Sequence, residues 1–362
     1  MKTLISFSNP DLAKALIKKI HKRARGLPEV RLMEVCGTHT MEIGRLGLRS
    51  LLPDNVKLIS GPGCPVCVTP EYIIDSAVNY AMQPGYTLLS FGDMIRVPGT
   101  KGSLEHAKAN GGSLEIVTSP LQILDMAVQK PDHMFVFAAV GFETTVPVIS
   151  RTVELAQERN LKNVKMLVAH RLLPPALTAL CTDPDSNING FLLPGHVSVI
   201  LGSIAYKNIE ALQVPAAITG FESIDILGGI FSVLEMIGEN NIDVSNMYQR
   251  AVRPMGNPHA VALIDKIFRP VDALWRGIGT IPLSGLDLKD DYITFNAPLR
   301  STESSSSMPE GCSCGNVLMG RMVPSECSLF GRSCIPESPV GPCMVSTEGS
   351  CAAYFRYERT SL

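Results

Sequence analysis

The fold is decided by the stretch Val30-Arg-Leu-Met-Glu-Val-Cys-Gly-Thr-His39. It begins with a short apolar run, Val30–Val35, which leads directly into Cys36 and a segment of helical pattern. The same order recurs where Val56–Ser60 leads into Gly61-Pro-Gly-Cys-Pro-Val-Cys67. Apolar runs of this length are typical of strands that are buried on both faces of a parallel sheet.

This alternation of apolar runs and helical segments continues along the chain. The predicted strands are Val30–Val35, Val56–Ser60, Thr87–Phe91, Met134–Val140, Val164–Ala169, Gly190–Leu193 and Pro215–Thr219. The predicted helices between them include Met41–Leu52, Pro70–Met82, Pro120–Gln129, Thr144–Glu158 and Pro174–Leu180. Such an order predicts an α/β fold with parallel sheets that are covered by helices.

The length of 362 residues predicts two or three domains. We expect two parallel-sheet, Rossmann-like α/β domains that face a cleft, plus a smaller cysteine-rich domain. The predicted division is an N-terminal helix (1–28) that packs on the C-terminal domain, a first α/β domain (29–118), a second (119–230) and a C-terminal domain (231–362). A serine-rich break at 301–309 precedes most of the cysteines.

Composition excludes several classes of protein. A formal net charge of −2 gives no basic field for nucleic acid, and no apolar stretch is long enough to span a membrane. Hydrophobic residues make up 45% and charged residues 18%, which is typical of a globular chain. We therefore expect a cytoplasmic protein, in which clustered cysteines bind metals or exchange electrons more often than they form structural disulfides.

Three cysteines follow the first two predicted strands. Cys36 comes directly after Val30–Val35, and Cys64 and Cys67 follow Val56–Ser60. Because ligand sites in open parallel sheets form beyond the carboxyl ends of the strands, these thiols are expected at one sheet edge. Helix starts close behind them favour the thiolate form.

These residues allow three interpretations. The cysteines are buried and inert, or they form a zinc site in which Cys36, His39, Cys64 and Cys67 are a Cys₃His tetrahedron. In the third interpretation Cys64 and Cys67 are a redox pair and Cys36 is a separate metal ligand. Spacing does not decide between the last two. Asp93, Glu143, His170, His196 and Glu222 each follow a predicted strand, so some of them are further candidates for the same crevice.

Six cysteines lie near the C-terminus, at positions 312, 314, 327, 334, 343 and 351. Their spacing matches neither the compact ferredoxin run nor a zinc ribbon. Four thiolates are enough for a [4Fe–4S] cluster, which leaves two for a disulfide or a redox pair. Glycines and prolines between them suit loops around a metal.

Together these motifs resemble the hydrogenase maturation protein family HypD. The resemblance runs from about residue 30 to residue 357 and rests on Cys36-Gly-Thr-His39, Gly61-Pro-Gly-Cys-Pro-Val-Cys67, Gly141-Phe-Glu-Thr144, Pro194-Gly-His-Val197 and the C-terminal cysteines. It implies a scaffold on which the Fe(CN)₂CO unit of [NiFe]-hydrogenases is assembled, in complex with the small partner HypC. Cyanide is then delivered by the HypE–HypF system.

The resemblance also implies roles for individual residues. The family's C-x12-C-x6-C-x16-C spacing selects Cys314, Cys327, Cys334 and Cys351 as ligands of a [4Fe–4S] cluster, with Cys312 and Cys343 outside it. Cys36 corresponds to the iron ligand, and Cys64 and Cys67 to a redox-active pair, which we expect to relay electrons from the cluster. Glu348 resembles a family glutamate near the cluster. His39 follows Cys36 by three residues, in the first helical turn, and we expect it to orient or protonate groups at the iron.

On this basis the chain is expected to be an assembly scaffold with redox chemistry rather than a conventional turnover enzyme. Two other classes of function stay open. One is an iron–sulfur-dependent disulfide reductase, and the other is a zinc-stabilised binding module without redox chemistry.

Overall fold

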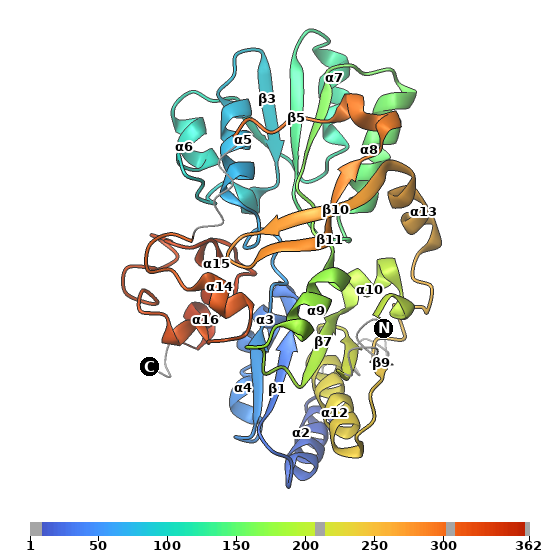
Figure 1. The fold of residues 1–362 in the computed structure, drawn as a ribbon, viewed down its shortest axis with the longest axis vertical. Coiled ribbons are helices and arrows are strands. Elements are labelled where there is room, and N and C mark those ends of the chain that lie inside the picture. Colours follow the sequence, from blue (N-terminus) through green and yellow to red (C-terminus); the bar gives the residue numbers. More distant parts are fainter. Residues whose placement is uncertain (1–8, 207–213, 302–307, 359–362) are drawn as a thin grey trace.

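The computed structural model describes residues 9–206, 214–301 and 308–358, and it is a mixed α/β protein with two parallel sheets (Figure 1). Sheet A has the order β2-β1-β7-β8-β9, with bounds Val56–Ser60, Val30–Glu34, Gly190–Pro194, Ala216–Thr219 and Val244–Asn246. Sheet B has the order β4-β3-β5-β6, with bounds Leu114–Ile116, Tyr86–Ser90, Met134–Ala139 and Val164–Val168. Strands β10 (Phe268–Trp275) and β11 (Gly279–Leu288) form an antiparallel hairpin.

Helices connect and cover these strands. In the first half of the chain they are α2 (Pro10–Ala24), α3 (Gly37–Arg45), α4 (Leu48–Leu51), α5 (Glu71–Ala81), η1 (Gly92–Met94), α6 (Leu104–Ala109), α7 (Gln122–Gln129), α8 (Val146–Glu158) and α9 (Leu173–Thr182). In the second half they are α10 (Gly195–Leu201), η2 (Ser203–Tyr206), α12 (Ser223–Glu239), α13 (Pro258–Ile267), η3 (Asp290–Phe295), α14 (Cys314–Leu318), η4 (Pro324–Glu326), α15 (Pro342–Val345) and α16 (Ser350–Tyr357). None of these described helices is both long and apolar enough to cross a membrane.

The predicted parallel sheets are confirmed, but the predicted ranges 29–118 and 119–230 do not follow them. After β2 the chain leaves sheet A, builds the whole of sheet B, and then returns to sheet A at β7. The reason is that β1 is an interior strand and pairs with β2 on one side and β7 on the other. Several apolar runs are equally suited to that second edge, so local sequence does not show which one fills it.

The N-terminal helix α2 lies within the predicted range 1–28 and begins at Pro10, where the Asn9 side chain accepts a hydrogen bond from the backbone of Asp11. It was predicted to pack on the C-terminal domain, taken to begin at residue 231, and α12 (Ser223–Glu239) crosses that boundary. The buried residues Ile20 and Ala24 share an apolar cluster with Ile230 of α12, so α2 packs on the helix after β8 rather than on the cysteine-rich end (Figure 1).

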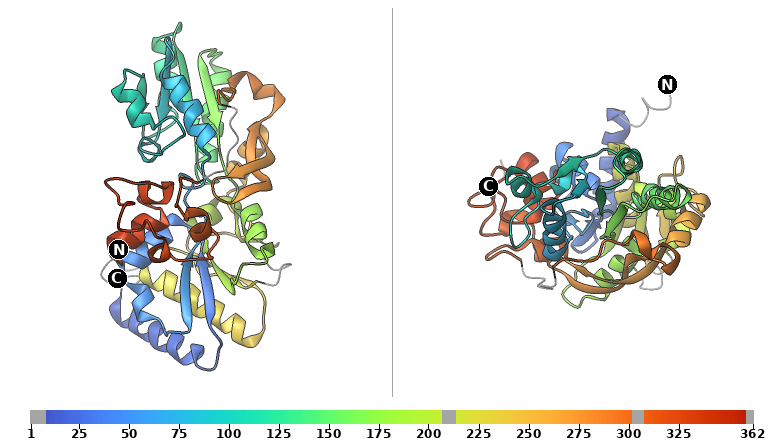
Figure 2. Two further views of the ribbon diagram at one scale, coloured as in Figure 1. Left: turned by 60° about the vertical axis from the view of Figure 1, so that its left-hand side comes forward. Right: turned by 90° about the horizontal axis from the view of Figure 1, so that it is seen from above.

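The cysteine-rich segment, residues 308–358, lies beside the middle of the molecule, next to α3 and the β10–β11 hairpin (Figure 2). Helix α16 packs on α3, and Arg49 links the two regions through ion pairs to Glu34 and Glu358. One apolar core includes buried side chains of sheet A, sheet B and this segment. The C-terminal cysteines are therefore held against the sheet edge that carries Cys36.

Candidate functional site

A cavity of about 240 Å³ lies between the carboxyl ends of sheet A and sheet B. It is bordered by the residues that follow β1, β2 and β7 on one side and β3 and β5 on the other. Its polar lining is Cys36, Thr38, Asp93, Thr144, Thr145, His196 and Glu348. Its apolar lining includes Val35, Val66, Phe91, Val140, Phe142, Leu173 and Val197. This is the edge at which ligands bind in parallel-sheet proteins.

Cys36 is the residue at which β1 passes into α3, and its extended backbone places the thiol at the cavity. The loops after β1 and β2 touch here, since a Cβ on Gly63 would lie 2.3 Å from the backbone nitrogen of Cys36. The expected thiolate is not supported. Burial of the thiol, together with the nearby Glu348 carboxylate, raises the pKa of Cys36 to about 11 despite hydrogen bonds from the α3 backbone.

Glu348 reaches the cavity from the cysteine-rich segment. Its Oε1 accepts a hydrogen bond of 2.8 Å from the hydroxyl of Thr38, in the first turn of α3. The approach is close, because a Cβ on Gly37 would lie 2.5 Å from the Cβ of Glu348. The structure thus brings Cys36 and Glu348 together, although 311 residues separate them in sequence.

His39 does not line the cavity. The Nε2 atom of its buried ring lies 2.9 Å from the Gly220 carbonyl and 3.0 Å from the Thr219 hydroxyl. Burial lowers the pKa of His39 to about 4. Sequence position alone misleads here, because α3 turns this side chain towards β8 and away from the site.

The histidine that does line the cavity is His196, in the first turn of α10. Its ring stacks on Phe221 with a centroid distance of 4.0 Å, and His39 lies on Phe221 as well, with a centroid distance of 4.7 Å. Burial lowers the pKa of His196, and Glu348 opposes that shift. Its place directly after β7 was the sequence signal that identified it as a candidate.

The other residues that follow strands divide between cavity and core. Asp93 lines the cavity, whereas Glu143 and His170 are buried outside its lining. Glu143 accepts a 2.8 Å hydrogen bond from the backbone of Leu173, and burial raises its pKa to about 7. Glu222 is exposed at the start of α12. Thr144 is a cavity residue that received no separate role from the sequence, although it belongs to the quoted Gly141–Thr144 motif.

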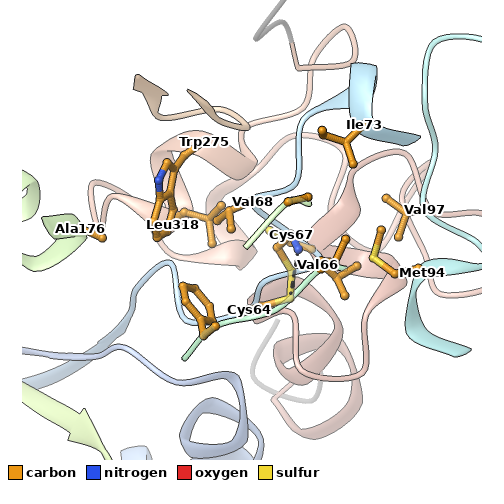
Figure 3. Close-up of a cluster of buried hydrophobic side chains, with 14 of the residues drawn as sticks. Cys64, Val66, Cys67, Val68, Ile73, Met94, Val97, Ala176, Trp275 and Leu318 are labelled. Atoms are coloured by element: carbon orange, nitrogen blue, oxygen red, sulfur yellow. Dashed lines mark hydrogen bonds between the residues drawn. A yellow bond between two sulfur atoms is a disulfide. The ribbon is translucent and has the colours of Figure 1, made fainter. Parts of the chain in front are cut away.

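Cys64 and Cys67 are joined by a disulfide, and Pro65 and Val66 of the loop between them line the cavity. Apolar side chains including Val66, Val68 and Met94 surround the disulfide, and both cysteines are buried (Figure 3). The zinc interpretation does not fit this arrangement, because two of its four ligands are oxidised and His39 is turned away. The Cys67 sulfur lies 3.9 Å from the carbonyl of Pro342, so the disulfide touches the cysteine-rich segment.

A second, much smaller cavity of about 10 Å³ lies within that segment. It is lined by Cys312, Cys314, Cys327, Cys334 and Cys351. Cys343 is buried beside it, and hydrogen bonds with the thiols of Cys314 and Cys351 raise its pKa. Hydrogen bonds with Cys314 and then Cys343 lower the pKa of Cys351 to about 6. The four cysteines predicted as cluster ligands are thus neighbours, but Cys312 lies among them.

Cysteine thiols are the donors that an iron–sulfur cluster needs. Among the described residues, no three His, Cys, Asp or Glu side chains converge as ligands of a single metal ion. A [4Fe–4S] cluster is different, because its ligands bind four irons at the corners of a cube and surround it. A Cβ on Gly341 would lie 2.5 Å from the sulfur of Cys312 and 2.9 Å from that of Cys314, so glycine is needed for the thiols to gather here. Five thiols around one cavity supply the donor type and number that such a cluster needs, but its eight atoms occupy more than about 10 Å³, so the thiols must move apart to hold it.

The fold and the site define an α/β protein with one thiol in a cavity between parallel sheets, a neighbouring disulfide and a cage of further cysteines. The profile of the HypD family, described as "Hydrogenase formation hypA family", matches residues 11–358, and the chain belongs to that family.

Curated relatives support this assignment across the whole chain. The chain is 40% identical to hydrogenase maturation factor HypD2 of Bradyrhizobium diazoefficiens, over 99% of this chain and 97% of the relative. It is 39% identical to hydrogenase maturation factor HypD of Azotobacter vinelandii, over 99% and 97%. It is also 39% identical to the HypD factor of Escherichia coli, over 99% of both chains.

Proposed function

We propose that this chain is a hydrogenase maturation factor on which the Fe(CN)₂CO unit of [NiFe]-hydrogenases is assembled, in complex with a small HypC-type chaperone. The names of its relatives support the general role. The observation that carries the finer proposal is the position of Cys36. Cys36 lines a small cavity at the sheet edge together with Pro65 and Val66 of the disulfide loop and Glu348 of the cysteine-rich segment.

Cys36 is proposed to hold the iron. Cyanide and CO produce a low-spin Fe(II) unit, for which a thiolate is a well-matched soft ligand. Because the pKa of Cys36 is raised to about 11, iron binding must displace the thiol proton. Glu348 lines the same cavity and is the carboxylate placed to accept that proton.

The cysteine-rich segment is proposed to carry the resident cofactor. Cys314, Cys327, Cys334 and Cys351 would hold a [4Fe–4S] cluster, which supplies electrons one at a time when bound. Since Cys312 also lines the cavity, the choice between Cys312 and Cys314 as the fourth ligand needs a direct test.

Cys64 and Cys67 are proposed as the redox pair next to the iron site. Two electrons and two protons convert their disulfide to two thiols. Differential alkylation followed by mass spectrometry should find both states in the purified protein, and a pair that stays in one state under all mild conditions would contradict this role.

The burial of Cys64 and Cys67 favours the scaffold function over that of a stand-alone disulfide reductase. The exposed fractions of Cys64 and Cys67 are 3% and 0%, so a protein disulfide has no access to these sulfurs. Internal transfer towards Cys36 needs no such access.

Infrared spectroscopy of the anaerobic complex with the small chaperone tests the proposal. Bands of iron-bound cyanide and CO should appear when the HypE–HypF cyanide-delivery system is co-expressed, and should be missing without it. A protein that contains about four irons but never shows these bands, even with all partners present, would favour the reductase.

A further inference from the structure

The cavity around Cys36 contains four side chains that carry an N–H or O–H donor and are not thiols: Thr38, Thr144, Thr145 and His196. Two of these donors are already used. The hydroxyl of Thr38 donates to Glu348 over 2.8 Å, and that of Thr145 donates to the Phe142 carbonyl over 3.0 Å.

The remaining two donors have no hydrogen-bond acceptor among the described residues. Thr144 is exposed at the loop between β5 and α8, and His196 is exposed in the first turn of α10, where only ring contacts hold it. An imidazole carries at least one N–H in either protonation state, so this donor does not depend on titration.

The two free donors come from opposite walls. His196 follows β7, which pairs directly with the strand that ends at Cys36, whereas Thr144 follows β5 of sheet B. Apart from these groups and two carboxylates, the lining is largely apolar. The volume of about 240 Å³ is below the roughly 300–1,000 Å³ of sites for larger organic ligands.

Cyanide and CO differ in what such a lining offers them. A cyanide bound to iron keeps much of its negative charge on nitrogen, which accepts charge-assisted hydrogen bonds. The oxygen of a bound CO is a poor acceptor and is better accommodated against apolar groups. A site built to donate hydrogen bonds also discriminates against a ligand that cannot accept them.

We propose that Thr144 and His196 are the positioning residues for the two cyanide nitrogens of an iron unit held by Cys36, and that the apolar wall of the cavity receives the CO. This assignment rests on the proposed scaffold function. It gives both exposed donors an acceptor inside the cavity, and it connects sheet A and sheet B through the cargo.

The test is infrared spectroscopy of the anaerobic complex with the small chaperone. Thr144→Val removes the hydroxyl at nearly constant volume, and His196→Phe keeps the stacking ring but removes the N–H. Each variant should shift one cyanide band, the double variant should shift both, and the CO band should move least. Thr144→Ser and His196→Gln, which keep a donor, should give bands close to those of the unmodified protein.

Exchange from H₂O into D₂O supplies an independent readout. The cyanide bands of the unmodified protein should show a small isotope shift, because their hydrogen-bond donors exchange, and this shift should disappear at the affected band in each variant. Thr152→Val is the matched control, since the Thr152 hydroxyl donates to the Val148 carbonyl on α8 away from the cavity.

Unmoved cyanide bands in both Thr144→Val and His196→Phe would overturn the assignment. Loss of all bands in Thr144→Val with recovery in Thr144→Ser would support it, whereas equal loss in both would contradict it. Absence of cyanide and CO bands from the unmodified complex is a separate result, because it would reject the scaffold function itself.

Discussion

The two thiol sites of this molecule differ in the space around their sulfurs. Cys36 faces a cavity of about 240 Å³ that is lined from both sheets, whereas five cysteines of the C-terminal segment surround a cavity of about 10 Å³. A roomy site with one thiol suits a cargo that enters and leaves. A tight cage of many thiols suits a group that stays. Under the proposed function, the same residue type would serve a transient ligand in one region and a resident cofactor in the other.

The largest expected effect is that of Cys36→Ser, which should disable the proposed iron site and leave the C-terminal cysteines unaffected. Serine nearly preserves the side-chain volume but offers a hard, weakly acidic oxygen to the iron. Cyanide and CO bands and the restoration of hydrogenase activity in a deletion strain should be lost, while the visible absorbance of the iron–sulfur cluster should remain. Retention of bands and activity would exclude Cys36 as the iron ligand.

Replacing a cysteine that lines the small C-terminal cavity by alanine should have the opposite effect on the cluster absorbance. Cys327→Ala, Cys334→Ala or Cys351→Ala should each abolish the cluster absorbance and lower the iron content, because a cubane needs four thiolates. Of Cys312→Ala and Cys314→Ala, the family spacing predicts loss only in the second. Loss in the Cys312 variant instead would assign the fourth ligand to Cys312, and an intact cluster in all five variants would reject the cage.

Gly37→Ala tests the contact that joins the two sites. The added Cβ would lie 2.5 Å from the Cβ of Glu348, so the cysteine-rich segment must shift. We expect a loss of about 1–3 kcal/mol in unfolding free energy by denaturant titration, which is typical of overpacking. Gly92→Ala is the matched control on the opposite wall, where the nearest atom is 3.8 Å away. Equal effects of both changes would show that the contact is not tight.

The smallest expected effect concerns pH. Burial raises the pKa of Glu143 to about 7 from an ordinary value of 4.5, so the folded state binds the proton more tightly than the unfolded state. Its contribution to stability is full below about pH 4.5 and is lost as pH rises towards 7. Glu143→Gln, which keeps an acceptor for the Leu173 amide, should flatten this part of a thermal unfolding profile. Burial also raises the pKa of Glu34 to about 7, so Glu34 should still contribute to the pH dependence of stability in that variant. An unchanged profile would show that Glu143 does not cause the pH dependence.

The local sequence pattern was sufficient to predict most of the strands. The runs that became β1, β2, β3, β5, β6, β7 and β8 were all predicted to within a residue or two. The short strands β4 and β9, with three residues each, carry too little pattern to detect. The hairpin was missed as well, because its strands mix buried and exposed residues irregularly and contain a bulge.

By itself the sequence determined that apolar strands end in cysteine-bearing loops, because strand periodicity and loop chemistry are local properties. It also determined the family, through motifs spread over the chain. Only the tertiary structure decided which strands share a sheet, that His196 rather than His39 faces the cavity, and that the Cys36 thiol is held neutral. The physical reason is that strand neighbours, side-chain direction and desolvation depend on contacts between segments far apart in the chain. Glu348 beside Thr38 is the clearest of those contacts.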